Sequence, residues 1–151
     1  MADQEVLDVT LQVARTLSAI GLDYVVGGSL ASSMHGIPRS TQDVDILVFM
    51  AHDDVEPWLA EERNRRQSVG ITDSGESVDV SSAEDNILHK LKWYQKGGEV
   101  SEQQWRDVLG VMKVQGEELD LSYLDQWARR LGLEDLLEQA LTDAGLAGGE
   151  S

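Results

Sequence analysis

The spacing of apolar and polar positions predicts alternating helices and strands in the first half of the chain. Between residues 5 and 20 apolar side chains recur every three or four positions, the period of an amphipathic helix, and Gly21 follows as a stop signal. Residues 22–26 are partly β-branched or aromatic and bounded by glycine, which predicts a strand. A glycine turn leads into a short helical segment at 30–35, and the near-continuous apolar run 44–50 predicts a strand buried on both faces. The stripe of the first helix consists of Val6, Val9, Val13, Leu17 and Ile20.

The second half of the sequence is dominated by helical patterns. Residues 53–67 predict a helix with Pro57 in its first turn, and residues 77–80 predict a third strand. Two consecutive serines followed by acids form overlapping capping boxes before the next helix, and Ser101 opens another. The apolar stripes of the four later helices are Ile87, Leu91 and Tyr94; Trp105, Val108, Leu109 and Met112; Leu124, Trp127, Ala128 and Leu131; and Leu133, Leu136, Leu137, Ala140 and Leu141.

This order of elements predicts an α/β (α+β) fold with a small mixed β-sheet. We expect the sheet and its helices in residues 1–80 and a helical C-terminal part in residues 81–145, within a single domain 1–151. A length of 151 residues is enough to bury a core without disulfides or a structural metal.

The composition narrows the class of protein. The sequence holds no cysteine, which excludes disulfides, thiolate zinc sites and cysteine nucleophiles and is compatible with a reducing compartment. Its acidic, polar beginning is unlike a signal peptide, and the longest apolar stretch, 46–51, is too short to span a bilayer. We therefore expect a soluble, cytoplasmic protein that does not bind membranes.

The charge is strongly acidic, with 12 basic against 28 acidic side chains and a formal net charge of −16. Such a chain repels nucleic acid phosphates and anionic lipids at long range, so a polyanion would need a local positive site. The dense basic run Arg63-Asn-Arg-Arg66 follows two glutamates in a predicted helix, and we interpret it as a solvated helix face with mixed charges.

The candidate chemistry lies between residues 25 and 50, VVGGSLASSMHGIPRSTQDVDILVFM. Residues two apart on a strand point to the same side, so Asp43 and Asp45 would project together. Two neighbouring carboxylates suit a hard cation, and Mg²⁺ completes its shell with water and substrate phosphates. Upstream, the Gly27-Gly28-Ser29 turn opens a helix whose first N–H groups would attract an anion. A carboxylate pair and a phosphate-binding turn together predict a metal–nucleotide site.

The spacing of these residues resembles a known superfamily, whereas other phosphate motifs are absent. The sequence has no P-loop, no dinucleotide-binding glycine fingerprint and no calcium-binding EF-hand loop. Gly27-Gly28-Ser29, the thirteen residues before Asp43-Val44-Asp45 and the intervening HGIPRST at 35–41 resemble the DNA polymerase β-like nucleotidyltransferase superfamily. The resemblance is greatest to its small prokaryotic branch, which contains minimal and toxin-antitoxin nucleotidyltransferases.

The resemblance implies a role for each residue that matches the motif. Gly27, Gly28 and Ser29 would hold the phosphates of a nucleoside triphosphate, while Asp43 and Asp45 would bind two Mg²⁺ ions. Arg39 and Lys90 fit a phosphate contact as well as they fit a surface cation or a helix-end partner.

A third carboxylate is normal in this superfamily, and Asp79 in Ser77-Val78-Asp79-Val80 is the candidate. The short span to Glu84-Asp85 leaves an alternative, in which this segment is a later hairpin strand and the chain lacks the third acid.

The resemblance thus implies an enzyme that transfers a nucleoside monophosphate to a hydroxyl. The acceptor would be an RNA end, a protein or a small molecule, and a cognate partner protein would accompany a toxin-antitoxin role. The alternative is a catalytically reduced binding or regulatory subunit without the third carboxylate. A helical interaction protein with incidental carboxylates is a further interpretation, against which the spacing from Gly28 to Asp43 argues.

Overall fold

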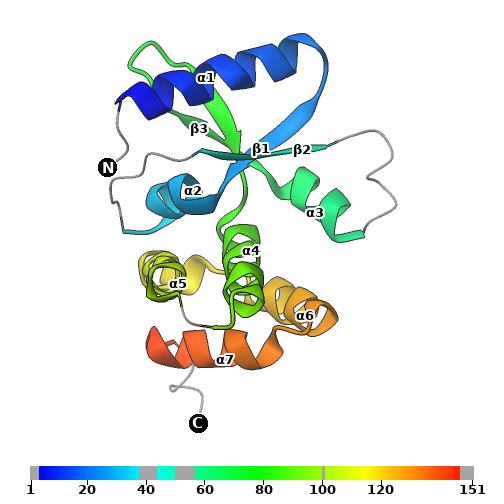
Figure 1. Ribbon diagram of the computed structural model, residues 1–151, viewed down its shortest axis with the longest axis vertical. Helices are drawn as coiled ribbons and strands as arrows, with labels where there is room; N and C mark the ends of the chain where they lie inside the picture. Colours follow the sequence, from blue (N-terminus) through cyan, green and yellow to red (C-terminus); the bar gives the residue numbers. More distant parts are fainter. Residues whose placement is uncertain (1–3, 38–43, 50–56, 100, 147–151) are drawn as a thin grey trace. The chain divides into compact units, whose positions relative to one another are not determined.

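The computed structural model describes residues 4–37, 44–49, 57–99 and 101–146 (Figure 1). Residue contacts divide the chain into two compact units. The first consists of residues 1–31 and 39–82, and the second of residues 32–38 and 83–151.

The first unit is built on a four-stranded mixed sheet with the strand order β2-β1-β4-β3. Strand β1 pairs antiparallel with β2 and parallel with β4, and β4 pairs antiparallel with β3. The strands are β1 Asp23–Gly27, β2 Asp45–Phe49, β3 Gln67–Gly70 and β4 Ser77–Val80. The helices are α1 Gln4–Ala19, which packs against β1 and β4, and α3 Pro57–Arg65, which packs against β1. The mixed α/β sheet expected from the sequence is confirmed.

Helix α2, Gly28–His35, starts in the first unit and ends in the second. Its last turn is followed by Gly36, where an added Cβ would lie 2.6 Å from the backbone nitrogen of Val111. Glycine therefore allows the end of α2 to approach the backbone of α5, Glu102–Gln115. Gln115 adds a 2.8 Å hydrogen bond to the carbonyl of His35.

The buried face of α1 differs from the apolar stripe that the sequence predicted. On α1 the buried side chains are Val6, Thr10, Leu11 and Ala14, whereas Val9 and Val13 are exposed. The predicted stripe missed Thr10, Leu11 and Ala14. Thr10 is the polar residue among them, and its hydroxyl satisfies its hydrogen-bonding need inside the core by donating a 2.7 Å hydrogen bond to the Val6 carbonyl.

Strand β2 is not buried on both faces as its apolar run predicted. Of its five residues only Phe49 is buried, and Ile46, Leu47 and Val48 are partly exposed. The reason is topological, since among the described strands β2 lies at the edge of the sheet and pairs with β1 alone. The fourth strand, β3, was not predicted, because its sequence Gln-Ser-Val-Gly has no alternating apolar pattern.

The second unit is helical, as expected from the run of amphipathic patterns. Its helices are α4 Ala83–Lys96, α5, the short 3₁₀ segment η2 Gly116–Glu118, α6 Leu121–Leu131 and α7 Glu134–Asp143. The Ser101 side chain caps the N-terminus of α5 by accepting a hydrogen bond from the backbone N–H of Gln104. The Asp120 side chain caps α6 by accepting one from the backbone N–H of Tyr123. Its fully buried large side chains are Ile87, Leu88, Leu91, Met112, Leu124 and Leu133. None of the helices in the described part of the chain has the length and apolar character that a bilayer crossing needs.

Candidate active site

The glycine turn stands where the sequence placed it, between β1 and α2. Gly27 is the last residue of β1 and Gly28 the first of α2. Gly28 has a φ of 60°, in the left-handed region that favours glycine. The turn therefore brings the N-terminus of a helix, with its partial positive charge, to the end of a central strand.

Asp45 lies directly beside this turn. It is the first residue of β2, it pairs with Gly27 in the antiparallel register, and its side chain is exposed. A Cβ added to Gly28 would lie 2.8 Å from Asp45 Cγ and 3.0 Å from its Cβ, and would overlap the carboxylate. The structure thus brings a predicted metal ligand against the predicted phosphate-binding turn, although seventeen positions separate Gly28 and Asp45 in sequence.

Two further candidates, Arg39 and Asp43, lie outside the described residues.

Asp79 projects from the same face of the sheet as Asp45. Val26 pairs with both Ile46 and Val80, so these three side chains share one face, and their neighbours Asp45 and Asp79 share the other. Strand β1 separates the two carboxylates, and two strand spacings amount to about 10 Å. Strand β4 is also a hairpin partner of β3, which is the strand pairing of the alternative considered from the sequence, while the role of Asp79 as a third acid stays a prediction.

The carboxylate of Asp79 is occupied by Arg66. Arg66 Nε lies 3.1 Å from Asp79 Oδ2, and its Nη2 lies 3.4 Å from Asp23 Oδ1. Its Nη1 donates a 2.7 Å hydrogen bond to the carbonyl of Arg63. Arg66 follows α3 and precedes β3, so its assignment to a solvated helix face was wrong. Its acidic partners are 13 and 43 positions away in sequence, which no local pattern reveals.

Tyr24 on β1 completes this acidic corner of the sheet. Its hydroxyl oxygen accepts a 3.0 Å hydrogen bond from the Asp79 backbone N–H. Burial raises the pKa of Tyr24 above its usual value, and the nearby Asp79 charge acts in the same direction. The hydrogen bond from Asp79 and the positive charge of Arg66 oppose that rise in pKa.

Lys90, the second candidate phosphate contact, is buried in the second unit. Its ammonium lies 2.9 Å from Asp107 Oδ2, and both side chains are almost inaccessible. Asp107 also accepts a hydrogen bond from Gln103. The contact seen at Lys90 is therefore a structural ion pair between α4 and α5.

The acids at the start of α4 are also engaged within the second unit. Glu84 accepts the backbone N–H of Asp120, and Asp85 accepts a 2.6 Å hydrogen bond from the Tyr123 hydroxyl. Both acids are buried. Their hydrogen bonds explain how the polar start of α4 is accommodated in the core of the second unit.

Of the two predicted metal ligands, Asp45 is a described residue, and its carboxylate is a suitable ligand for a hard cation. Asp45 supplies an exposed carboxylate, a type of ligand that Mg²⁺ binds, next to a turn where a side chain at position 28 would overlap it. Within the described ranges, no three Asp, Glu or His side chains come together as a complete metal site.

Comparison with known proteins identifies the fold. No protein-family model matches the chain, and no curated protein matches it by sequence. A solved structure, described as an antigenic nucleotidyltransferase-like protein from Paracoccidioides brasiliensis, is similar with a TM-score of 0.52 and 16% identity. The similarity covers 94% of each chain. At this identity it shows the fold alone, so this chain has a nucleotidyltransferase-like fold.

Proposed function

We propose that this protein is a magnesium-dependent nucleotidyltransferase, which moves a nucleoside monophosphate from a nucleoside triphosphate to a hydroxyl. The observation that carries the proposal is the packing of Asp45 against Gly28. It joins a carboxylate suited to Mg²⁺ with a helix N-terminus suited to phosphate, on a nucleotidyltransferase-like fold.

Each part of the turn has a role in this proposal. Gly27, Gly28 and Ser29 bind the triphosphate through backbone N–H groups, and Asp45 holds the metal together with Asp43. When bound, Mg²⁺ neutralises charge on the transferred phosphate and on the departing pyrophosphate. The protein orients the nucleotide on the rigid end of β1, so the acceptor hydroxyl meets a fixed α-phosphate. Arg39 remains a proposed phosphate contact, whereas the pairing of Lys90 with Asp107 favours a structural role for Lys90.

The acceptor is proposed by class. The net charge of −16 disfavours a long nucleic acid that approaches the chain alone. A protein hydroxyl or a small molecule is the better acceptor for the isolated chain, and an RNA end requires a cognate partner with a basic surface, as in a toxin-antitoxin pair. We place this activity in a reducing, cytoplasmic compartment, in keeping with the absence of cysteine.

Calorimetry tests the site before the acceptor is known. Each of the four nucleoside triphosphates is titrated with and without Mg²⁺ into the native chain, Asp45→Asn and the control Asp73→Asn. Asp73 is exposed in the turn between β3 and β4, so its variant makes the same charge change away from the turn at Gly28. We expect Mg²⁺-dependent binding that Asp45→Asn loses and Asp73→Asn keeps. Equal binding by all three proteins would refute the site.

A second candidate function, a catalytically reduced binding or regulatory subunit, is favoured by one observation. Asp79 is held by Arg66 and lies across β1 from Asp45, an arrangement that suits a structural acid. The variants Asp79→Asn and Arg66→Gln separate the two functions once transfer of an α-labelled nucleotide can be measured. A catalytic Asp79 predicts lost transfer with retained nucleotide binding in Asp79→Asn. A structural Asp79 predicts that both variants lower the unfolding free energy alike and keep whatever binding or transfer the native chain shows.

A further inference from the structure

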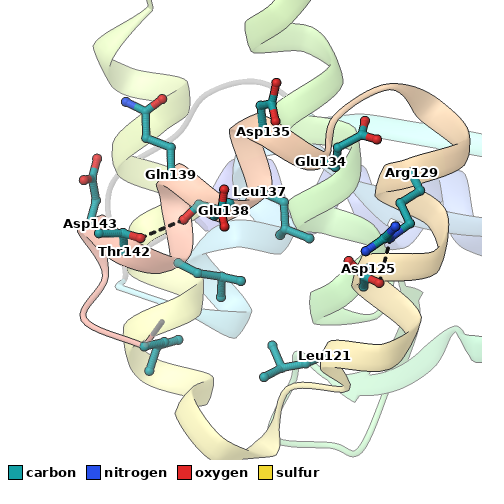
Figure 2. Close-up of a pocket in the computed structure, with 12 residues that line it drawn as sticks. Leu121, Asp125, Arg129, Glu134, Asp135, Leu137, Glu138, Gln139, Thr142 and Asp143 are labelled. Atoms are coloured by element: carbon teal, nitrogen blue, oxygen red, sulfur yellow. Dashed lines mark hydrogen bonds and ion pairs between the residues drawn. The ribbon is translucent and has the colours of Figure 1, made fainter. Parts of the chain in front are cut away.

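The second unit carries a groove that the proposed reaction does not use. It has a volume of about 910 Å³ and is lined by residues of α6, α7 and the segment that ends at Leu146 (Figure 2). We call it the α6/α7 groove. Its apolar lining consists of Leu121, Leu137, Leu141 and Leu146. Leu121 is 50% exposed and contributes accessible apolar surface to the groove.

The charged residues around these leucines are almost all acidic. Five carboxylates line the groove, and Arg129, the one cation among the lining residues, is already paired with Asp125 at 3.0 Å. Figure 2 shows Glu134, Asp135 and Glu138 along α7, with Leu137 between them, and Asp143 at its end. The groove therefore combines an apolar interior with a negative rim.

This chemistry selects the occupant. The negative rim repels nucleic acids and anionic lipid surfaces, and a second copy of a chain with a net charge of −16 would bring further carboxylates to it. A cationic helix with one apolar face matches both properties, because its leucine-like side chains fill the groove and its lysines or arginines meet the rim. We propose that the α6/α7 groove binds a basic amphipathic helical segment of a partner protein.

The test uses synthetic helical peptides and the full chain without nucleotide, so its outcome does not depend on the proposed reaction. One peptide carries leucines at i, i+3, i+4 and i+7 with lysines elsewhere, and a second keeps the leucines but replaces each lysine with glutamate. A third has the composition of the first in scrambled order. Fluorescence anisotropy measures each affinity. We expect the lysine peptide to bind at least about tenfold more tightly than either of the others.

Variants of the protein locate the binding. Glu134→Lys/Glu138→Lys reverses two rim charges, and Glu117→Lys/Glu118→Lys makes the same change in η2, at exposed residues that do not line the groove. We expect the first pair to weaken binding about tenfold and the control pair to change it less than about threefold. Leu121→Ser, at a half-exposed position, should weaken binding without disturbing the core. In the native chain, peptide-induced amide NMR shifts should concentrate in α6 and α7.

Three results would overturn the proposal. Equal affinity for the ordered and scrambled lysine peptides would show general attraction to an acidic chain. Equal loss in both charge-reversal variants would place the contact elsewhere. A dimer of the protein alone that dissociates in Leu121→Ser would assign the groove to a second copy.

Discussion

Gly28 meets two geometric demands at once, and each would be met by few other residues. Its positive φ suits the junction between β1 and α2, and its missing side chain leaves the space that the Asp45 carboxylate fills. The site is therefore specified at the level of single atoms, by an absent Cβ as much as by a present carboxylate.

We predict that Gly28→Ala loses Mg²⁺-dependent nucleotide binding to the same extent as Asp45→Asn. The added Cβ would displace the Asp45 side chain, and the positive φ would add a strain of about 1–3 kcal/mol. Calorimetry measures the binding, and urea unfolding measures the stability.

Gly21→Ala is the matched control, because Gly21 also has a positive φ, of 79°, but a Cβ there meets no atom within 4 Å. It should share the loss of stability and keep nucleotide binding. If Gly28→Ala binds nucleotide as well as Gly21→Ala does, the close packing of Asp45 has no role in the site.

Tyr24 gives the structure a signature at alkaline pH. Because burial raises its pKa in the folded state, the unfolded chain begins to lose the tyrosine proton near pH 10 while the folded chain keeps it. The contribution of the neutral Tyr24 hydroxyl to the free energy of unfolding is thus fully present below pH 10. The free energy of unfolding falls as the pH rises above 10. Tyr24→Phe should lower stability at neutral pH, through loss of the bond from Asp79 N–H, but flatten the alkaline decline by up to about 1.4 kcal/mol per pH unit. Urea unfolding between pH 8 and 11 measures this, and parallel curves for the two proteins would contradict it.

At the scale of helices and strands, local patterns predicted most elements but not all of their environments. The helices of the second unit follow from their apolar stripes and capping residues such as Ser101, because those signals act within a few residues. Whether β2 is buried on both faces and whether residues 67–70 form a strand depend on the order of the strands in the sheet. That order is set by pairing between residues that lie far apart in the sequence. The same limit applies at the site, where the turn at Gly28 was predictable but the pairing of Arg66 with Asp79 was not.

The ion pair of Lys90 with Asp107 links α4 to α5. We predict that breaking it lowers the free energy of unfolding substantially. Asp107→Asn removes the carboxylate from a buried ammonium and should lower the unfolding free energy by about 3–5 kcal/mol. Replacing both members, as in Lys90→Met/Asp107→Leu, should cost less, because both charges of the pair are removed together. Urea unfolding measures both.

The exposed pair of Arg129 with Asp125 within α6 provides the comparison. Asp125→Asn should change the unfolding free energy by about 0.3–0.5 kcal/mol, as is usual for exposed pairs one helical turn apart. A loss in Asp107→Asn no greater than this would show that the buried pair contributes little to the packing of α4 on α5.

At the scale of the whole molecule, the net charge of −16 sets the response to salt. Carboxylates repel one another more strongly in the compact folded state than in the unfolded chain, and salt screens this repulsion. We predict that the urea midpoint rises as sodium chloride increases from roughly 10 to 300 mM. Neutralising exposed acids, as in Glu117→Gln/Glu118→Gln, should raise the midpoint at low salt and reduce the rise. A midpoint that falls with salt would mean that attractive ion pairs outweigh the repulsion.

Helix α2 also determines how this chain can be divided. Because residues 32–38 belong to the second unit while residues on both sides of them belong to the first, the polypeptide passes from one unit to the other three times. A single cut after residue 82 would strip the last turn of α2 from the helices it packs with, and would leave that turn attached to the sheet as an orphan. The helical unit therefore cannot be exchanged as one continuous segment of the chain. A recombination event or an engineered fusion that gave the sheet a new set of helices would also have to change the end of the helix that starts at Gly28.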